Sequence, residues 1–183
     1  MIRLVAPAAP ILTAAEVRQW AQIDHTDDDS FLDGLIEAAT GYLDGMDGVL
    51  GRALITQTWR LDLAAFPRGP LRLPLRPVQS ITSIETVDGE DAATAFDAFR
   101  VVGDEIEATG GWAGTYPRRD AVRVTFVAGY GDTADDVPRP IRAAASMMVR
   151  HWYDNRSAVS EGDMREVPMG AWMLLEPYRT RHI

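Results

Sequence analysis

The sequence contains no cysteine and no lysine. Without cysteine, disulfide bonds, thiol catalysis and cysteine-ligated zinc or iron–sulfur sites are excluded. All 18 basic residues are arginines. A Walker-type phosphate loop, a Schiff-base enzyme and a Ser–Lys dyad are therefore excluded as well, because each of them needs a lysine amine. These two absences remove several large classes of enzyme chemistry.

Long apolar runs are missing too. No run approaches the roughly 18 residues of a transmembrane helix, so we expect no membrane partner. Residues 1–10 hold one arginine and two prolines where a secretory signal would carry a basic region and a long apolar stretch, so we expect no such signal. The chain has 183 residues, 46% of them hydrophobic and 25% charged. This composition is typical of a globular protein of one domain, or two at most.

Positive charge is scarce in the first part of the chain. The formal net charge is −9, and residues 1–50 carry nine acidic residues against two arginines. The remaining residues are nearly balanced, and no basic stripe is present. We therefore expect no sequence-specific DNA binding and no attachment to an anionic membrane surface.

Residue patterns divide the chain into three blocks, 1–51, 52–132 and 133–183. The first and third blocks have helical spacing of apolar residues, and the second has the period-two alternation of strands. We predict a single α+β domain over residues 1–183, in which an antiparallel β-rich insertion interrupts a helical bundle.

The first block contains two helix starts. Thr13 and Glu16 match the capping box, which predicts a short helix to about Ile23. A second helix follows the acidic run at residues 27–29, and glycines at 45, 48 and 51 end it. Its apolar residues cover a wide face, which indicates burial against more than one partner.

The β-rich block contains several strand signals. Residues 55–63 and 121–127 alternate between apolar and polar side chains, as half-buried strands do. Pro74 restricts the segment around it to a sheet edge or to no strand at all. We expect a strand from Val78 to Val87 and two short strands around a turn at Gly103.

The third block begins at two prolines, which the first turn of a helix tolerates. Ile141, Ala145, Met148 and Trp152 then form one apolar stripe. Residues 157–167 are polar and contain glycine, so we expect a mobile loop. A short helix rich in large apolar residues follows Pro168.

That last helix allows two interpretations. Residues 172–175 are consecutive and apolar, so they point around much of a short helix. A helix that is apolar on all sides must be buried on several of them. Either it belongs to the core of its own chain, or it is an anchor that inserts into a groove on another protein.

Other candidate sites are weak. The acidic run 27–29 lacks calcium-loop spacing, and carboxylates at a helix start complement the helix dipole. Capping and solvation are therefore the favoured explanation. His25, His151 and His182 are far apart and lack zinc-ligand spacing. Glu105 and Glu107 share one strand face and are the pair that a small carboxylate-dependent hydrolase would use.

Several separated motifs, in one order, resemble the head–tail connector (adaptor) proteins of long-tailed phages, prophages and phage-derived gene transfer agents. One of them, residues 124–132, reads Val-Thr-Phe-Val-Ala-Gly-Tyr-Gly-Asp. The resemblance extends from about Leu12 to Arg179. The other matching segments are 51–59, 66–67 with 71–74, 78–84, 137–142, 151–156 and 168–179.

The resemblance implies a structural role. Such adaptors form a ring under the portal protein, extend the DNA channel and offer a platform for the stopper or tail-terminator protein. They are not enzymes and use no cofactor or metal. By analogy this chain would form a homo-oligomeric ring, a dodecamer on the portal and a monomer when free. DNA would pass through its channel without specific binding.

The resemblance also implies candidate interface residues. In relatives the C-terminal segment docks on the portal, and here that role falls on residues 168–183. The anchors expected there are Trp172, Leu175, Tyr178 and Arg179. Acidic side chains near the second helix start are candidates for the channel wall, because an acidic wall does not retain a polyanion. They are Asp27, Asp28, Asp29 and Asp33.

Two alternatives stay open. The first is another neck component, a stopper or a tail terminator, which we expect to be mainly β. The second is the small hydrolase that would use Glu105 and Glu107. We also expect residues 1–10, residues 157–167 and the last few residues to be mobile before assembly.

Overall fold

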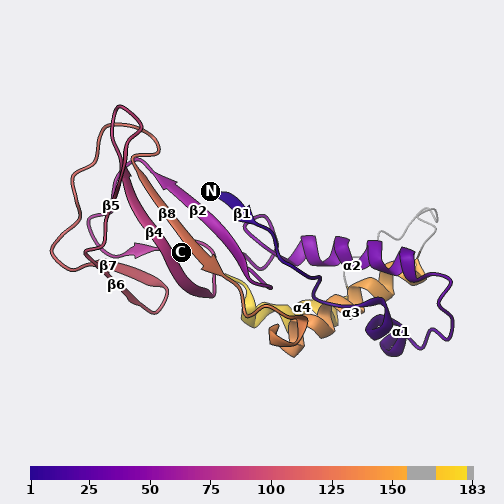
Figure 1. Ribbon diagram of the computed structural model, residues 1–183. Coiled ribbons are helices and arrows are strands. Elements are labelled where there is room, and N and C mark those ends of the chain that lie inside the picture. The colour runs from indigo at the N-terminus through magenta and orange to yellow at the C-terminus, as the bar shows by residue number, and fades with distance from the viewer. Residues whose placement is uncertain (156–167, 181–183) are drawn as a thin grey trace, which may run out of the picture. The chain divides into compact units, whose positions relative to one another are not determined.

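The computed structural model describes residues 1–155 and 168–180 (Figure 1). The chain divides into two compact units. The sheet unit consists of Met1–Ala8 and Thr56–Tyr130, and the helical unit consists of Ala9–Ile55 and Gly131–Ile183. The β-rich segment is therefore inserted between the two helical segments, as the three-block pattern predicts.

The larger sheet of the sheet unit is antiparallel, with strand order β1-β2-β8-β4-β5 in the described residues. Figure 1 shows β4 and β8 as long neighbouring strands near its centre. The strands are β1 (Ile2–Val5), β2 (Gln57–Leu63), β4 (Val78–Val87), β5 (Ala93–Ala95) and β8 (Val122–Ala128).

Strand β8 is central because both of its edges are paired, with β2 on one side and β4 on the other. Its residues alternate between buried and half-buried along the whole strand, which is the pattern that the sequence predicts for Val122, Val124 and Phe126. On the same face, Phe126 is aligned with Trp59 of β2 and Ile81 of β4. This face carries the core of the sheet unit.

A smaller sheet in the same unit has the order β3-β7-β6. Its strands are β3 (Leu71–Arg72), β6 (Phe99–Val102) and β7 (Glu105–Ala108). Gly103 has φ +62° in the turn between β6 and β7, a conformation that glycine adopts without steric cost. Strand β3 stops two residues before Pro74, which confirms the restriction that this proline imposes.

The helical unit contains α1 (Ala14–Ala21), α2 (Asp29–Leu43), α3 (Arg139–Asp154) and α4 (Met169–Leu175). Helix α3 packs against the other three, and α1 also contacts α2. The capping box is confirmed, because Thr13 caps the backbone of Glu16 while the Glu16 carboxylate accepts from the Thr13 backbone N–H at 2.8 Å. The core has fully buried side chains from α2 and α3, including Leu32, Ile36, Ile141, Met148 and Val149.

The α+β class with antiparallel sheets is confirmed. The expectation that residues 1–10 are mobile is wrong for Ile2–Val5, which pair with β2 as an edge strand. The Arg3 guanidinium also lies 5.6 Å from the centre of the Trp59 ring, and this contact holds the strand in place. The single domain stays a prediction, and the loop expected at 157–167 lies outside the described residues.

Candidate docking and assembly surfaces

Helix α4 is attached to its own unit along one face. Ala171 and Leu175, one turn apart, are both fully buried. After the helix, the Arg52 guanidinium donates to the Tyr178 carbonyl, and the Thr180 backbone N–H donates to the Leu50 carbonyl at 2.9 Å. The segment that follows α4 is therefore fixed to residues 50–52 by hydrogen bonds.

The opposite face of α4 is open. Met169 is 80% exposed and Met173 is 73% exposed. Met147 of α3 is also exposed, and its sulfur lies 4.0 Å from the position that a Cβ at Gly170 would take. We call Met147, Met169 and Met173 the methionine patch. Unbranched, polarisable methionine side chains adapt to the shape of a bound surface, so this patch is suited to docking.

The interpretation that the last helix belongs to the core of its own chain is confirmed for its inner face. Its outer face is accessible, and docking of this face on a partner stays a prediction. Met169 and Met173 are not among the anchors predicted from the sequence. They are four residues apart on the side of the helix opposite Ala171 and Leu175, and this spacing could have identified the exposed face.

The predicted anchor residues differ in accessibility. Trp172 is half-buried, with its ring 6.4 Å from that of Tyr42 in an edge-on contact and the Arg179 guanidinium 5.8 Å from its centre. Tyr178 is half-buried and Arg179 is exposed. Leu175 is fully buried against its own unit, so its side chain is not accessible to a partner. A role for Leu175 as a surface anchor does not fit this arrangement.

The predicted acidic residues also differ from one another. Asp28 accepts a hydrogen bond from the Tyr153 hydroxyl at 2.6 Å, and Asp29 lies 2.9 Å from the Arg18 guanidinium. These two carboxylates therefore tie α2 to α3 and α1. Asp27 and Asp33 are exposed, so of the four only they present carboxylates openly to solvent.

A groove lies between α1 and the first half of α3, with a volume of about 430 Å³. Trp20 stands at this groove with 63% of its surface exposed. Arg142 also lines it and bonds Glu16, Asp135 and the Ile11 carbonyl, which joins the two helices. Sequence reasoning did not identify this groove, since its walls come from residues more than a hundred positions apart.

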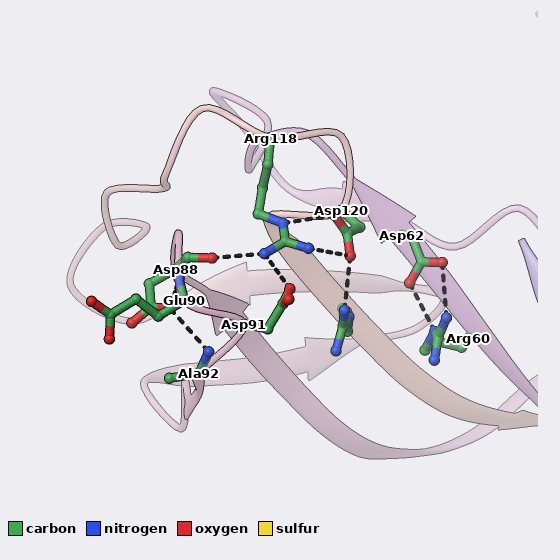
Figure 2. Close-up of polar contacts among 9 residues, drawn as sticks. Arg60, Asp62, Asp88, Glu90, Asp91, Ala92, Arg118 and Asp120 are labelled. Carbon is green, nitrogen blue, oxygen red and sulfur yellow. Dashed lines mark hydrogen bonds and ion pairs between the residues drawn. The ribbon is translucent and has the colours of Figure 1, made fainter.

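In the sheet unit, Arg118 organises a polar cluster (Figure 2). Its guanidinium donates to Asp120 at 2.7 Å and to the Asp88 carbonyl at 2.7 Å, and it pairs with Asp91 at 2.7 Å. Asp120 also accepts from Arg123 at 2.8 Å. Hydrogen bonds from Arg118, which has the larger effect, and from Arg123 hold the pKa of Asp120 well below its ordinary value. This cluster fastens the loop before β8 to the turn after β4.

Both glutamates of the hydrolase alternative form ion pairs with arginines. Glu105 pairs with Arg72 at 2.6 Å, and Glu107 pairs with Arg100 at 2.6 Å. Each carboxylate of the proposed hydrolase pair thus has its own arginine across the sheet. Within residues 1–155 and 168–180, no group of three or more histidine or acidic side chains is placed to hold a metal ion. None of the helices in this part of the chain has the length and apolar character needed to cross a membrane.

Comparisons with known proteins complete the description of these surfaces. The family model described as head completion protein matches residues 10–163. Three solved structures contain similar chains, and in each case the alignment covers 100% of this chain and 97% of the other. No curated protein matches the sequence significantly.

The three structures are of gene transfer agent (GTA) particles. One is described as the neck of an empty GTA particle computed with C6 symmetry (27% identity, TM-score 0.79). Another is the virion of a native GTA particle (26% identity, TM-score 0.80). The third is the neck of a native GTA particle computed with C12 symmetry (27% identity, TM-score 0.72).

Proposed function

This chain belongs to the head completion protein family, and on that premise we propose that it is the head-to-tail adaptor in the neck of a phage-like particle. It forms a ring between the portal protein and the stopper or tail terminator, and it extends the channel through which DNA passes. Its role is structural and involves no reaction and no cofactor.

The observation that carries this proposal is the likeness, over the whole chain, to a chain in the necks of GTA particles. Those necks were computed with C6 and C12 symmetry, which supports a ring of identical subunits and, for this chain, a dodecamer. A closed ring forms when a patch on one subunit binds a different patch on the next subunit. The rotation between neighbours must also bring the last copy back to the first. A free chain whose patches bind weakly stays a monomer until the portal collects its copies.

We propose that α4 and the segment after it dock on the portal. The methionine patch provides the apolar contact. Trp172, whose ring contacts the Arg179 guanidinium, adds with Arg179 and Tyr178 the aromatic and charged contacts. Arginine and aromatic residues are enriched where protein interfaces concentrate their binding energy. Leu175 supports the docking indirectly, because its buried side chain holds α4 against its own unit.

For the channel wall we propose Asp27 and Asp33, whose side chains are exposed. Asp28 and Asp29 add negative charge at the same helix start, although each is bound within the chain. A wall of this sign repels the phosphate backbone, so DNA moves past it without being held.

The helical unit favours the adaptor over a stopper or a tail terminator, because we expect those components to be mainly β. The arginine partners of Glu105 and Glu107 count against the hydrolase alternative. A free acid and a free base are what such an enzyme needs.

The test is binding of the full chain to portal-bearing heads that lack a neck, followed by size exclusion and negative-stain imaging. We expect ring-shaped complexes with the native chain. The double variant M169E/M173E should lose binding by at least about tenfold, because it buries two charges in an apolar contact. Absence of any portal binding by the native chain would refute the adaptor role.

A matched control places the same charge on exposed apolar residues of the sheet unit. Val101 and Val102 of β6 are about half exposed, so V101E/V102E should fold and should bind as the native chain does. If V101E/V102E abolishes portal binding and M169E/M173E does not, the docking surface lies on the sheet unit and the proposal for α4 fails.

A further inference from the structure

Portal docking through α4 and a channel wall at Asp27 and Asp33 leave two surfaces of the helical unit without a role. The first is the groove between α1 and α3, and the second is the exposed face of α2 that follows Asp33, which we call the outer face of α2. Neither includes a residue of α4. A ring needs two different patches on each subunit, and these two surfaces differ in chemistry.

The groove combines an apolar wall with one unused positive charge. Trp20 is its largest side chain and is mostly exposed. Arg139 is exposed at the groove and has no ion pair or hydrogen bond within the described part of the chain, whereas the charge of Arg142 is already compensated by Glu16 and Asp135. The groove is therefore suited to an apolar surface that brings a carboxylate. Its remaining lining residues are Leu12, Pro140, Ala143 and Ser146.

One lining residue places a polar group at the base of the groove. Ser146 is 4% exposed, and its hydroxyl has no hydrogen-bond partner among residues 1–155 and 168–180. Buried polar groups nearly always have such a partner. Ser146 therefore forms a polar point at the buried base of an otherwise mainly apolar groove.

The outer face of α2 is unusually flat. Gly34, Glu37, Ala38 and Gly41 are all exposed and lie at helical spacing. Glycine within an exposed helix lowers its stability, yet a Cβ added at Gly34 or Gly41 would meet nothing within 4 Å. Packing within the chain therefore does not require these glycines. They allow another surface to approach the α2 backbone closely.

We propose that the outer face of α2 in one copy of this chain occupies the α1–α3 groove of the next copy in the ring. The Trp20 indole packs on the flat surface of Gly34, Ala38 and Gly41. Arg139 pairs with Glu37 across the boundary. This inference rests on the proposed function, because it names the subunit contact that builds the proposed ring.

Charge and geometry both favour a second copy as the occupant. Glu37 is exposed and has no ion pair in the described residues, and it belongs to the acidic part of the chain, residues 1–50. A helix laid into a groove is a recurrent mode of recognition. The groove and the helix face are different patches, so each copy uses both and the contact repeats around a ring instead of stopping at a dimer.

The absence of cysteine allows a direct test by cross-linking of the full-length chain, free at high concentration and bound to portal-bearing heads. In the double variant R139C/E37C the two introduced thiols are the only ones in this chain, so a short bis-maleimide links two copies of it only through them. We expect a ladder of covalent multimers from this variant and no ladder from R139C or E37C alone. The matched control R139C/D47C, with the second thiol at another exposed acidic position, should give no ladder.

Charge exchange provides an independent readout. R139E and E37R, each alone, should reduce the yield of rings by at least about tenfold, since each places like charges opposite one another. The double variant R139E/E37R should restore the yield.

G34Q should raise the thermal unfolding midpoint of the free chain, because glutamine stabilises a helix better than glycine does. It should still abolish rings, because its side chain prevents the close approach to the α2 backbone.

The outcomes separate this contact from the adaptor role. If rings form on the portal but R139C/E37C gives no ladder, or if R139E assembles as the native chain does, the proposed contact is wrong and the adaptor role stands. If no ring forms on the portal or at high concentration, the proposed function fails, and this contact fails with it.

Discussion

At the scale of single residues, the charged cluster around Arg118 is the feature whose behaviour is simplest to predict. Arg118 and Arg123 donate to Asp120 and stabilise its charged form, so the pKa of Asp120 lies below its ordinary value in the folded chain. A carboxylate of this kind stabilises the fold above its unfolded pKa, near 4. That stability is lost as the pH falls through the lower, folded pKa.

We therefore expect D120N to be less stable than the native chain at pH 7, with the difference shrinking as the pH falls below about 4. Denaturant unfolding between pH 7 and pH 2.5 measures this difference. D132N serves as the control for removing one carboxylate, because Asp132 is exposed and has no ion pair in the described residues, and at pH 7 its free energy of unfolding should differ from that of the native chain by no more than about 0.5 kcal/mol. A D120N difference that stays constant below pH 4 would contradict the role given to this carboxylate.

Structural features that depend only on residues close together in the chain were predictable from the sequence. The Thr13–Glu16 capping box needs only four consecutive residues, and it forms as expected. The groove contacts of Arg142 were not predictable, because its partners include Glu16 and the Ile11 carbonyl, far away in sequence. No local pattern contains that pairing.

At the scale of secondary-structure elements, strong periodicity was reliable and weak edge strands were not. The alternation in β8 and the turn at Gly103 predicted their strands. Strands β1 and β5 were missed, because they are short, fully exposed and held mainly by pairing with β2 and β4. Strand formation of this kind depends on a partner that lies elsewhere in the chain.

Helix α4 leads to a prediction that separates its two faces. Leu175 is fully buried and Met173 is mostly exposed, although the two side chains lie two residues apart. L175A should lower the free energy of unfolding by about 2–5 kcal/mol, through lost burial and a cavity. M173A should change it by no more than about 0.5 kcal/mol. Denaturant unfolding of both variants is the measurement, and a similar loss for both would show that α4 does not pack as described.

At the scale of the whole molecule, the sequence predicted the order helical, β-rich, helical. It did not predict that residues 1–8 belong to the sheet unit. The first helical segment, Ala9–Ile55, is therefore flanked in sequence by parts of the sheet unit at both of its ends. The three-block interpretation assigned these residues to the helices because they adjoin them in sequence. Pairing of Arg3 with Trp59 across more than fifty residues decides their place instead.

The inserted sheet unit leads to the last prediction. Ile55 and Gly131, where the helical unit is interrupted, form a parallel bridge with each other. Because these two positions are adjacent, residues 56–130 can be replaced by a short Gly/Ser linker without stretching the chain. A chain of residues 9–55, the linker and 131–183 should therefore fold, with the far-ultraviolet circular dichroism of a helical protein and a cooperative thermal transition. Each unit buries its own apolar side chains, and this is the physical reason to expect independent folding. A helical spectrum that melts without cooperativity would mean that the helices need the sheet unit, and that residues 1–183 fold as the single domain predicted from the sequence.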